Sequence, residues 1–183
     1  MGRFAIKAGT EMPMTEVGAL CRRIHDDKAA QVREEIQERE LSKIPLDGLE
    51  NLGDYDGEDW LEGLSVSFRY VKKEELDMAL ATWTDALLAI DDGDGLLEKA
   101  KLDAKASAAA AGFVAIAVSE LTGLRGLDGP IEIKANGIGR LTDEDVETLS
   151  DAGLVTLLFN IGCYSQRLDD EKKALWWSAQ PPT

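Results

Sequence analysis

Residues 64–90, LSVSFRYVKKEELDMALATWTDALLAI, carry the clearest secondary-structure signal in the chain. The first seven residues alternate apolar and polar side chains, a period of two that is typical of a half-buried strand. One face of that strand would carry Leu64, Val66, Phe68 and Tyr70. From residue 73 the period changes to that of a helix with a single apolar stripe, formed by Leu76, Leu80, Trp83, Leu87 and Ile90. A strand followed directly by a helix therefore anchors the predicted fold.

Two further helices are predicted on either side of this unit. Thr15 can cap a helix over residues 15–41, whose first turns place Val17, Leu20 and Ile24 on one face. After the glycine-rich, acidic interruption at residues 91–95, a second helix is expected over residues 96–122, with an alanine-rich centre. That centre suits the core because small side chains allow a neighbouring helix to approach closely.

The C-terminal third predicts shorter elements. Glycines at 123, 126 and 129 indicate a turn region, and residues 131–134 form a possible short strand. Thr142 stands three residues before Asp145, the spacing of a capping box, and predicts a helix of about nine residues. Gly153 should end it, and an apolar helix should then run towards Leu168. At the other end of the chain, residues 3–7 give a weak strand signal.

The predicted fold is mainly α with a small β component (α+β), a compact helical domain with one or two short strands. A length of 183 residues fits a single domain over residues 1–183. Residues 1–14 and 174–183 are expected to be extended arms. Residues 46–63 are expected to be an acidic loop, because glycines and carboxylates alternate there without a basic residue.

The charge balance excludes some functions. With 35 Asp and Glu against 20 Lys and Arg, the net charge is -15, which disfavours binding to a phosphate backbone.

The two cysteines, Cys21 and Cys163, do not make the framework of a small secreted scaffold. The N-terminus lacks the apolar run of a signal peptide, and the longest uncharged stretch, residues 106–119, is too short to span a membrane. A cytoplasmic protein is expected.

No residue is assigned a catalytic, cofactor-binding or metal-binding role. His25 is the only histidine, and its four-residue spacing from Cys21 is more simply explained by a buried cysteine beside a partly exposed histidine than by a metal site. The acidic stretches 54–58 and 92–94 depart from the calcium-loop pattern, and no phosphate-binding loop is present. The sequence therefore favours a protein that is not an enzyme and has no cofactor.

Five large apolar residues stand near a loop or a chain end, where a functional explanation is needed: Trp60, Leu61, Leu175, Trp176 and Trp177. The terminal pair of tryptophans has two interpretations. It can fold back and complete the core, or it can anchor a partner chain, because tryptophan is favoured at binding hot spots. Burial of the indole rings distinguishes these alternatives.

The layout of residues 64–175 resembles that of tailed-phage tail assembly chaperones. The similar features are the strand SFRYV leading into the KEEL helix, the alanine-rich helix, the glycine turn GLRGLDGPIEI, and LTDEDVETL followed by an apolar helix. The resemblance implies a cytoplasmic factor that keeps the long apolar helices of a tape-measure-type protein soluble until a tail tube forms around them. It implies no catalytic residues.

The charge, the absence of catalytic motifs and the resemblance leave three candidate functions. The first is the tail assembly chaperone, whose partner is another phage structural or assembly protein and whose site is the host cytoplasm. A related alternative is a structural virion protein at a head or tail joint. The third is an acidic inhibitor that imitates nucleic acid and binds a basic protein, which only the net charge supports. Membrane and nucleic-acid binding are not expected, and a homo-oligomer remains open.

Overall fold

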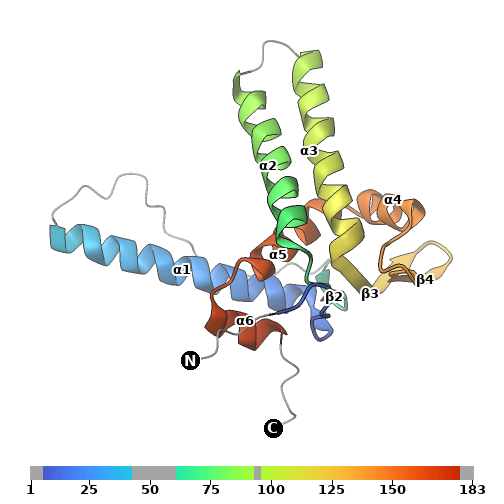
Figure 1. Ribbon diagram of the computed structural model, residues 1–183, viewed down its shortest axis with the longest axis horizontal. Coiled ribbons are helices and arrows are strands. Elements are labelled where there is room, and N and C mark those ends of the chain that lie inside the picture. The colour runs from blue at the N-terminus through green and yellow to red at the C-terminus, as the bar shows by residue number, and fades with distance from the viewer. Residues whose placement is uncertain (1–5, 43–60, 93–95, 178–183) are drawn as a thin grey trace, which may run out of the picture.

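The computed structural model describes residues 6–42, 61–92 and 96–177, and within them the fold is mainly helical with a small antiparallel sheet. This confirms the predicted α+β class. The helices are α1 (Val17–Ser42), α2 (Lys73–Asp92), α3 (Leu96–Ala117), α4 (Asp143–Asp151), α5 (Val155–Gln166) and α6 (Asp170–Trp177). The helix α1 and the α2–α3 pair project from the body in different directions (Figure 1).

The sheet has four strands in the order β1-β2-β3-β4, all antiparallel, where one or two strands were predicted. The strands are β1 (Thr15–Glu16), β2 (Ser65–Phe68), β3 (Val118–Gly126) and β4 (Gly129–Lys134). Val66 pairs with Thr15 on one side and with Leu121 on the other, so β2 is a central strand. Full burial of Val66 and Phe68 confirms that this strand contributes to the core.

The predicted helix over residues 96–122 ends five residues early. The helix α3 stops at Ala117, and the chain passes directly into β3, which pairs with both β2 and β4. Val118 and Leu121 are completely buried there. Pairing with β2 outweighs the local helical pattern, because a strand at this position buries both side chains and satisfies the backbone. The expected short strand at 131–134 is present as part of β4.

The N-terminal elements differ from the prediction in one detail. Thr15 does not cap α1; it belongs to β1, and its hydroxyl donates to the carbonyl of Pro13 at 2.8 Å. Val17 and Leu20 in the first turns of α1 are fully buried, and the helix then continues away from the body (Figure 1). The helix was predicted over residues 15–41, and its observed C-terminal end at Ser42 differs from that prediction by one residue.

Residues 9–12 pack on the body instead of standing apart from it. The backbone amides of Gly9 and Met12 donate to the carbonyls of Tyr70 and Phe68, each at 2.7 Å, and Met12 is 2% exposed. Residues 6 and 7 do not form a strand. Most of the predicted acidic loop and residues 3–5 lie outside the described residues.

The C-terminal helices close the core. The capping box of α4 is formed as predicted, with the Thr142 hydroxyl accepting from the Asp145 amide and the Asp145 carboxylate accepting from the Thr142 amide, both at 3.1 Å. The helix α5 is largely buried, and its Gln166 side chain hydrogen-bonds the backbone of Arg69 and Val71. Residues 174–177 belong to α6, although an extended arm was expected over 174–183.

Among the described residues, no single helix is long and apolar enough to cross a membrane. The helices α4 and α5 reach the required length and hydropathy only as a pair, and they are bent by 108° with respect to each other.

Candidate protein-binding groove

The antiparallel helices α2 and α3 form a groove between them. It encloses about 270 Å³ and is lined by four residues from each helix: Glu75, Met78, Ala79 and Thr82 from α2, and Ala109, Gly112, Phe113 and Ile116 from α3. Both sets follow the spacing i, i+3, i+4 and i+7, so each helix contributes one face over two turns. We call this feature the α2–α3 groove.

The lining of the groove is mostly apolar and its floor is shallow. Phe113 forms the floor and is only 2% exposed, whereas Met78 at the rim is 72% exposed. A Cβ atom added to Gly112 would meet nothing within 4 Å, so the space above this residue is open. Small side chains at the centre of a groove allow the backbone of a second helix to approach closely.

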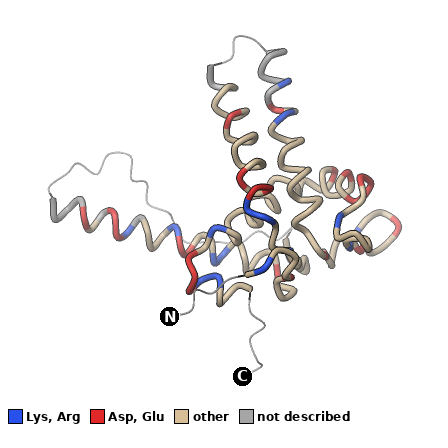
Figure 2. Tube along the Cα trace, viewed as in Figure 1, with Lys and Arg blue, Asp and Glu red and all other residues tan. Residues whose placement is uncertain are grey.

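The sequence explains why this face of the hairpin carries so little charge. Between Lys105 and Glu120 the chain has no ionisable side chain. Figure 2 accordingly shows the lower half of α3 without charged positions. Charges of both signs are instead interspersed along α1 (Figure 2). The groove is therefore an apolar surface on a strongly acidic protein.

A second pocket adjoins the groove at its end nearest the body. It encloses about 360 Å³, and Glu75 and Ile116 line both spaces. Its remaining lining includes Arg69, Lys72 and Arg140. We call this space the basal pocket.

The loop between β4 and α4 shapes the basal pocket. The Asn136 side-chain oxygen accepts hydrogen bonds from the amides of Ile138 and Arg140 at 3.1 and 3.2 Å. The Arg69 guanidinium donates to the carbonyl of Gly139, whose φ of +75° favours glycine. These bonds hold the side chain of Ile138 in an 85% exposed position.

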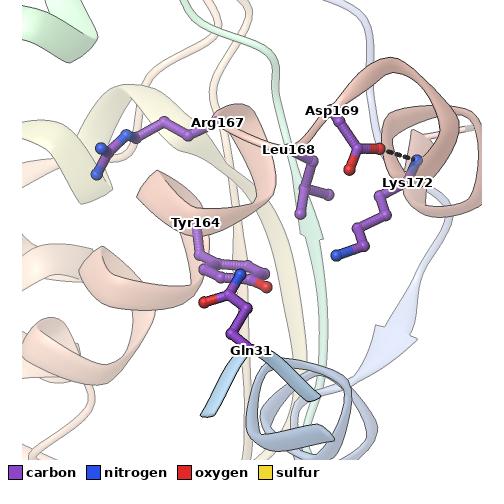
Figure 3. A pocket seen from close by; sticks show the side chains of 6 residues that line it. All are labelled: Gln31, Tyr164, Arg167, Leu168, Asp169 and Lys172. Carbon is purple, nitrogen blue, oxygen red and sulfur yellow. Dashed lines mark hydrogen bonds between the residues drawn. The ribbon is translucent and has the colours of Figure 1, made fainter. Parts of the chain in front are cut away.

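A polar cleft lies elsewhere, where α1 meets α5 and α6 (Figure 3). The Tyr164 hydroxyl donates to the Asp27 carboxylate at 2.5 Å, and the Lys172 amino group lies 3.6 Å from the same carboxylate. Burial raises the pKa of Tyr164, and the hydrogen bond to Asp27 is the second largest cause of this increase. Arg167 points away from Lys172 in Figure 3. These two contacts meet at the Asp27 carboxylate and fasten α1 to α5 and α6.

The large apolar residues identified in the sequence separate into two groups. Leu61, Trp176 and Trp177 are buried, and the Trp177 indole donates to the Ser165 carbonyl at 2.8 Å. Leu175 is 57% exposed, and Trp60 lies outside the described residues. The two terminal tryptophans therefore complete the core, the first of the two alternatives. Partner binding stays a prediction for the exposed Leu175.

Cys21 and His25 lie on α1, whereas Cys163 lies on α5. Burial raises the pKa of the Cys163 thiol to about 12, with Arg167 acting in the opposite direction, so this thiol is protonated and a poor nucleophile at neutral pH. The Nδ1 atom of His25 lies 3.8 Å from the carboxylate of Asp26. In the part of the chain that the structure describes, no three His, Cys, Asp or Glu residues are placed to hold a metal.

Sequence reasoning missed the α2–α3 groove. The predicted apolar stripe of α2 packs on the core through Leu76, Leu80 and Trp83, whereas Leu87 is 38% exposed. Met78 and Ala79 lie beside this stripe and line the groove. The available signal was the second i, i+3, i+4, i+7 series on each helix. Whether such a series is open depends on which face the rest of the chain covers.

No family model, curated protein or solved structure matches this chain.

Proposed function

We propose that the protein is a non-enzymatic tail assembly chaperone that holds an apolar helix of a tape-measure-type protein in the α2–α3 groove, in the host cytoplasm. The observation that carries the proposal is the groove itself, with its two matching helical faces and mostly apolar lining. An amphipathic helix laid in a groove between helices is a recurrent mode of protein recognition, read by anchors at i, i+3, i+4 and i+7.

The charge of the protein supports the same function. A net charge of -15 keeps a protein soluble while it covers an apolar segment of another chain. The layout of residues 64–175 adds the resemblance to tail assembly chaperones. Contact with the partner would then depend on buried apolar area, which salt does not weaken.

The test is capture of a tape-measure-type protein by the full-length chain at low salt and at about 0.5 M salt, where the screening length falls to a few Å. We expect capture at both salt concentrations. In Gly112→Leu, the new side chain would occupy the open space above residue 112 in the groove. This substitution should therefore abolish capture. Gly18→Leu is the matched control, because Gly18 is also a helical glycine with nothing within 4 Å of an added Cβ.

Two results would contradict the proposal. Unchanged capture by Gly112→Leu would remove the groove from the binding surface. Salt-sensitive binding to a basic DNA-handling protein, without any tape-measure partner, would favour the acidic inhibitor. Recovery of the chain in purified particles would instead favour a structural protein of the virion.

A further inference from the structure

The basal pocket has a charge opposite to that of the whole protein. Three of its lining residues, Arg69, Lys72 and Arg140, are basic, against the single carboxylate of Glu75. The chain as a whole carries a net charge of -15. The basal pocket is therefore a local excess of positive charge at the end of an apolar groove.

The protein neutralises only part of this positive charge. The Arg69 guanidinium lies 3.5 Å from the Glu11 carboxylate, which also accepts a hydrogen bond from the Ser119 hydroxyl at 2.6 Å. Lys72 and Arg140 are exposed, and within the described ranges neither forms an ion pair. The uncompensated charge thus belongs to the two side chains that reach solvent.

The groove and the basal pocket form one continuous surface, because Glu75 and Ile116 line both. Thr82 stands seven positions after Glu75, which corresponds to about 10 Å along α2, or two helical turns. The exposed Ile138 adds an apolar contact at the basal end. A ligand that fits this surface needs an apolar stretch of about two turns and then a negative group.

We infer that the segment bound in the α2–α3 groove is an amphipathic helix whose carboxylate-bearing end lies over Lys72 and Arg140. This inference rests on the proposed function and adds the chemistry and the direction of the bound helix. The apolar contacts supply affinity, and the charge pair fixes which end of the helix meets the basal pocket. Charge complementarity of this kind sets register and speeds association more than it strengthens binding.

The probes are two fluorescent synthetic peptides with the same apolar helical segment, one ending in three glutamates and the other in three lysines. At about 50 mM salt, where charges are weakly screened, we expect the glutamate peptide to bind roughly tenfold more tightly. Lys72→Glu with Arg140→Glu should abolish or reverse this preference. Arg125→Glu with Lys134→Glu makes the same change in net charge on β3 and β4, outside both linings, and should preserve the preference.

The outcomes separate this inference from the proposed function. Equal binding of both peptides, lost in Gly112→Leu, would overturn the charged-end inference and leave the groove function standing. Binding of either peptide that survives in Gly112→Leu, or no binding of either, would overturn the groove function. If inorganic phosphate displaces the glutamate peptide but leaves the lysine peptide bound, the basal pocket would be assigned to a free anion. A wild-type dimer that Gly112→Leu converts to monomer would assign the groove to a second copy.

Discussion

The two faces of the α2–α3 hairpin are built from the same helices but differ in what covers them. On the face towards α5, Trp83 and Phe113 each pack against Phe159, with ring centroids 5.3 and 5.6 Å apart. On the face that carries the groove, Met78 is 72% exposed and a Cβ added to Gly112 would meet nothing within 4 Å. Phe113 belongs to both, because its ring is buried against α5 and also forms the floor of the groove.

The difference between these faces separates folding from binding. Aromatic side chains occupy the covered face, where they bury large areas and stabilise the fold. The open face carries small residues and a flexible methionine, which suit a surface that must accept another helix. Substitutions on the covered face should therefore change stability, and those on the open face should change capture of a partner.

The largest effect is expected for Phe159→Ala. The side chain is 1% exposed and joins α5 to both helices of the hairpin. Its removal should lower the free energy of unfolding by about 3–5 kcal/mol, because it deletes buried area and leaves a cavity. Urea denaturation measures the loss. A change below about 1 kcal/mol would mean that α5 does not cover this face as described.

A smaller loss is expected for Gly162→Ala on α5. An added Cβ would stand 2.9 Å from the Phe113 ring and 3.1 Å from the Phe68 ring, both of which are buried. Overpacking of about 1–3 kcal/mol should exceed the gain in helix propensity of up to about 1 kcal/mol. The net result should be a lower midpoint of urea unfolding. An increase would show that the two rings yield easily.

The matched substitution on the open face, Gly112→Ala, should have the opposite sign. The new methyl group meets no atom, and alanine is favoured over glycine in a helix by about 0.5–1 kcal/mol. Thermal unfolding should therefore shift upward. If Gly112→Ala destabilises the protein as Gly162→Ala does, the groove must be covered in solution.

The smallest effect on stability is expected for Met78→Ser, because the side chain is 72% exposed. The free energy of unfolding should change by no more than about 0.5 kcal/mol. Capture of the partner helix should nevertheless weaken, since the substitution removes apolar area from the rim of the groove. Titration calorimetry with Met78→Leu as the control variant tests this, because leucine preserves the apolar contact.

Much of the fold could be predicted from periodicity. The strand β2 and the helices α2 and α4 have strong local patterns, and each formed close to its predicted bounds. The end of α3 could not be predicted, because Val118 and Leu121 fit a helical pattern as well as a strand. Only their pairing with a strand far away in the sequence decides between the two.

The same limit applied to the groove. Met78 and Gly112 are unremarkable in a single sequence, since nothing local shows whether a neighbouring element covers them. The tail had the opposite difficulty, because Trp176 and Trp177 are as compatible with an anchor as with a core. Their burial depends on Tyr70 and Tyr164, whose rings lie 5.1 and 5.8 Å from the respective partner indole.

The central position of β2 has a consequence for the order of folding. Its partners on both sides, Thr15 and Leu121, are separated from Val66 by roughly fifty residues each, so closing either pairing costs considerable chain entropy. The contacts between α2 and α3, joined by a short connection, are of much lower contact order and should form earlier. During synthesis on the ribosome, we therefore expect the helical hairpin to form before the sheet that joins it to α1.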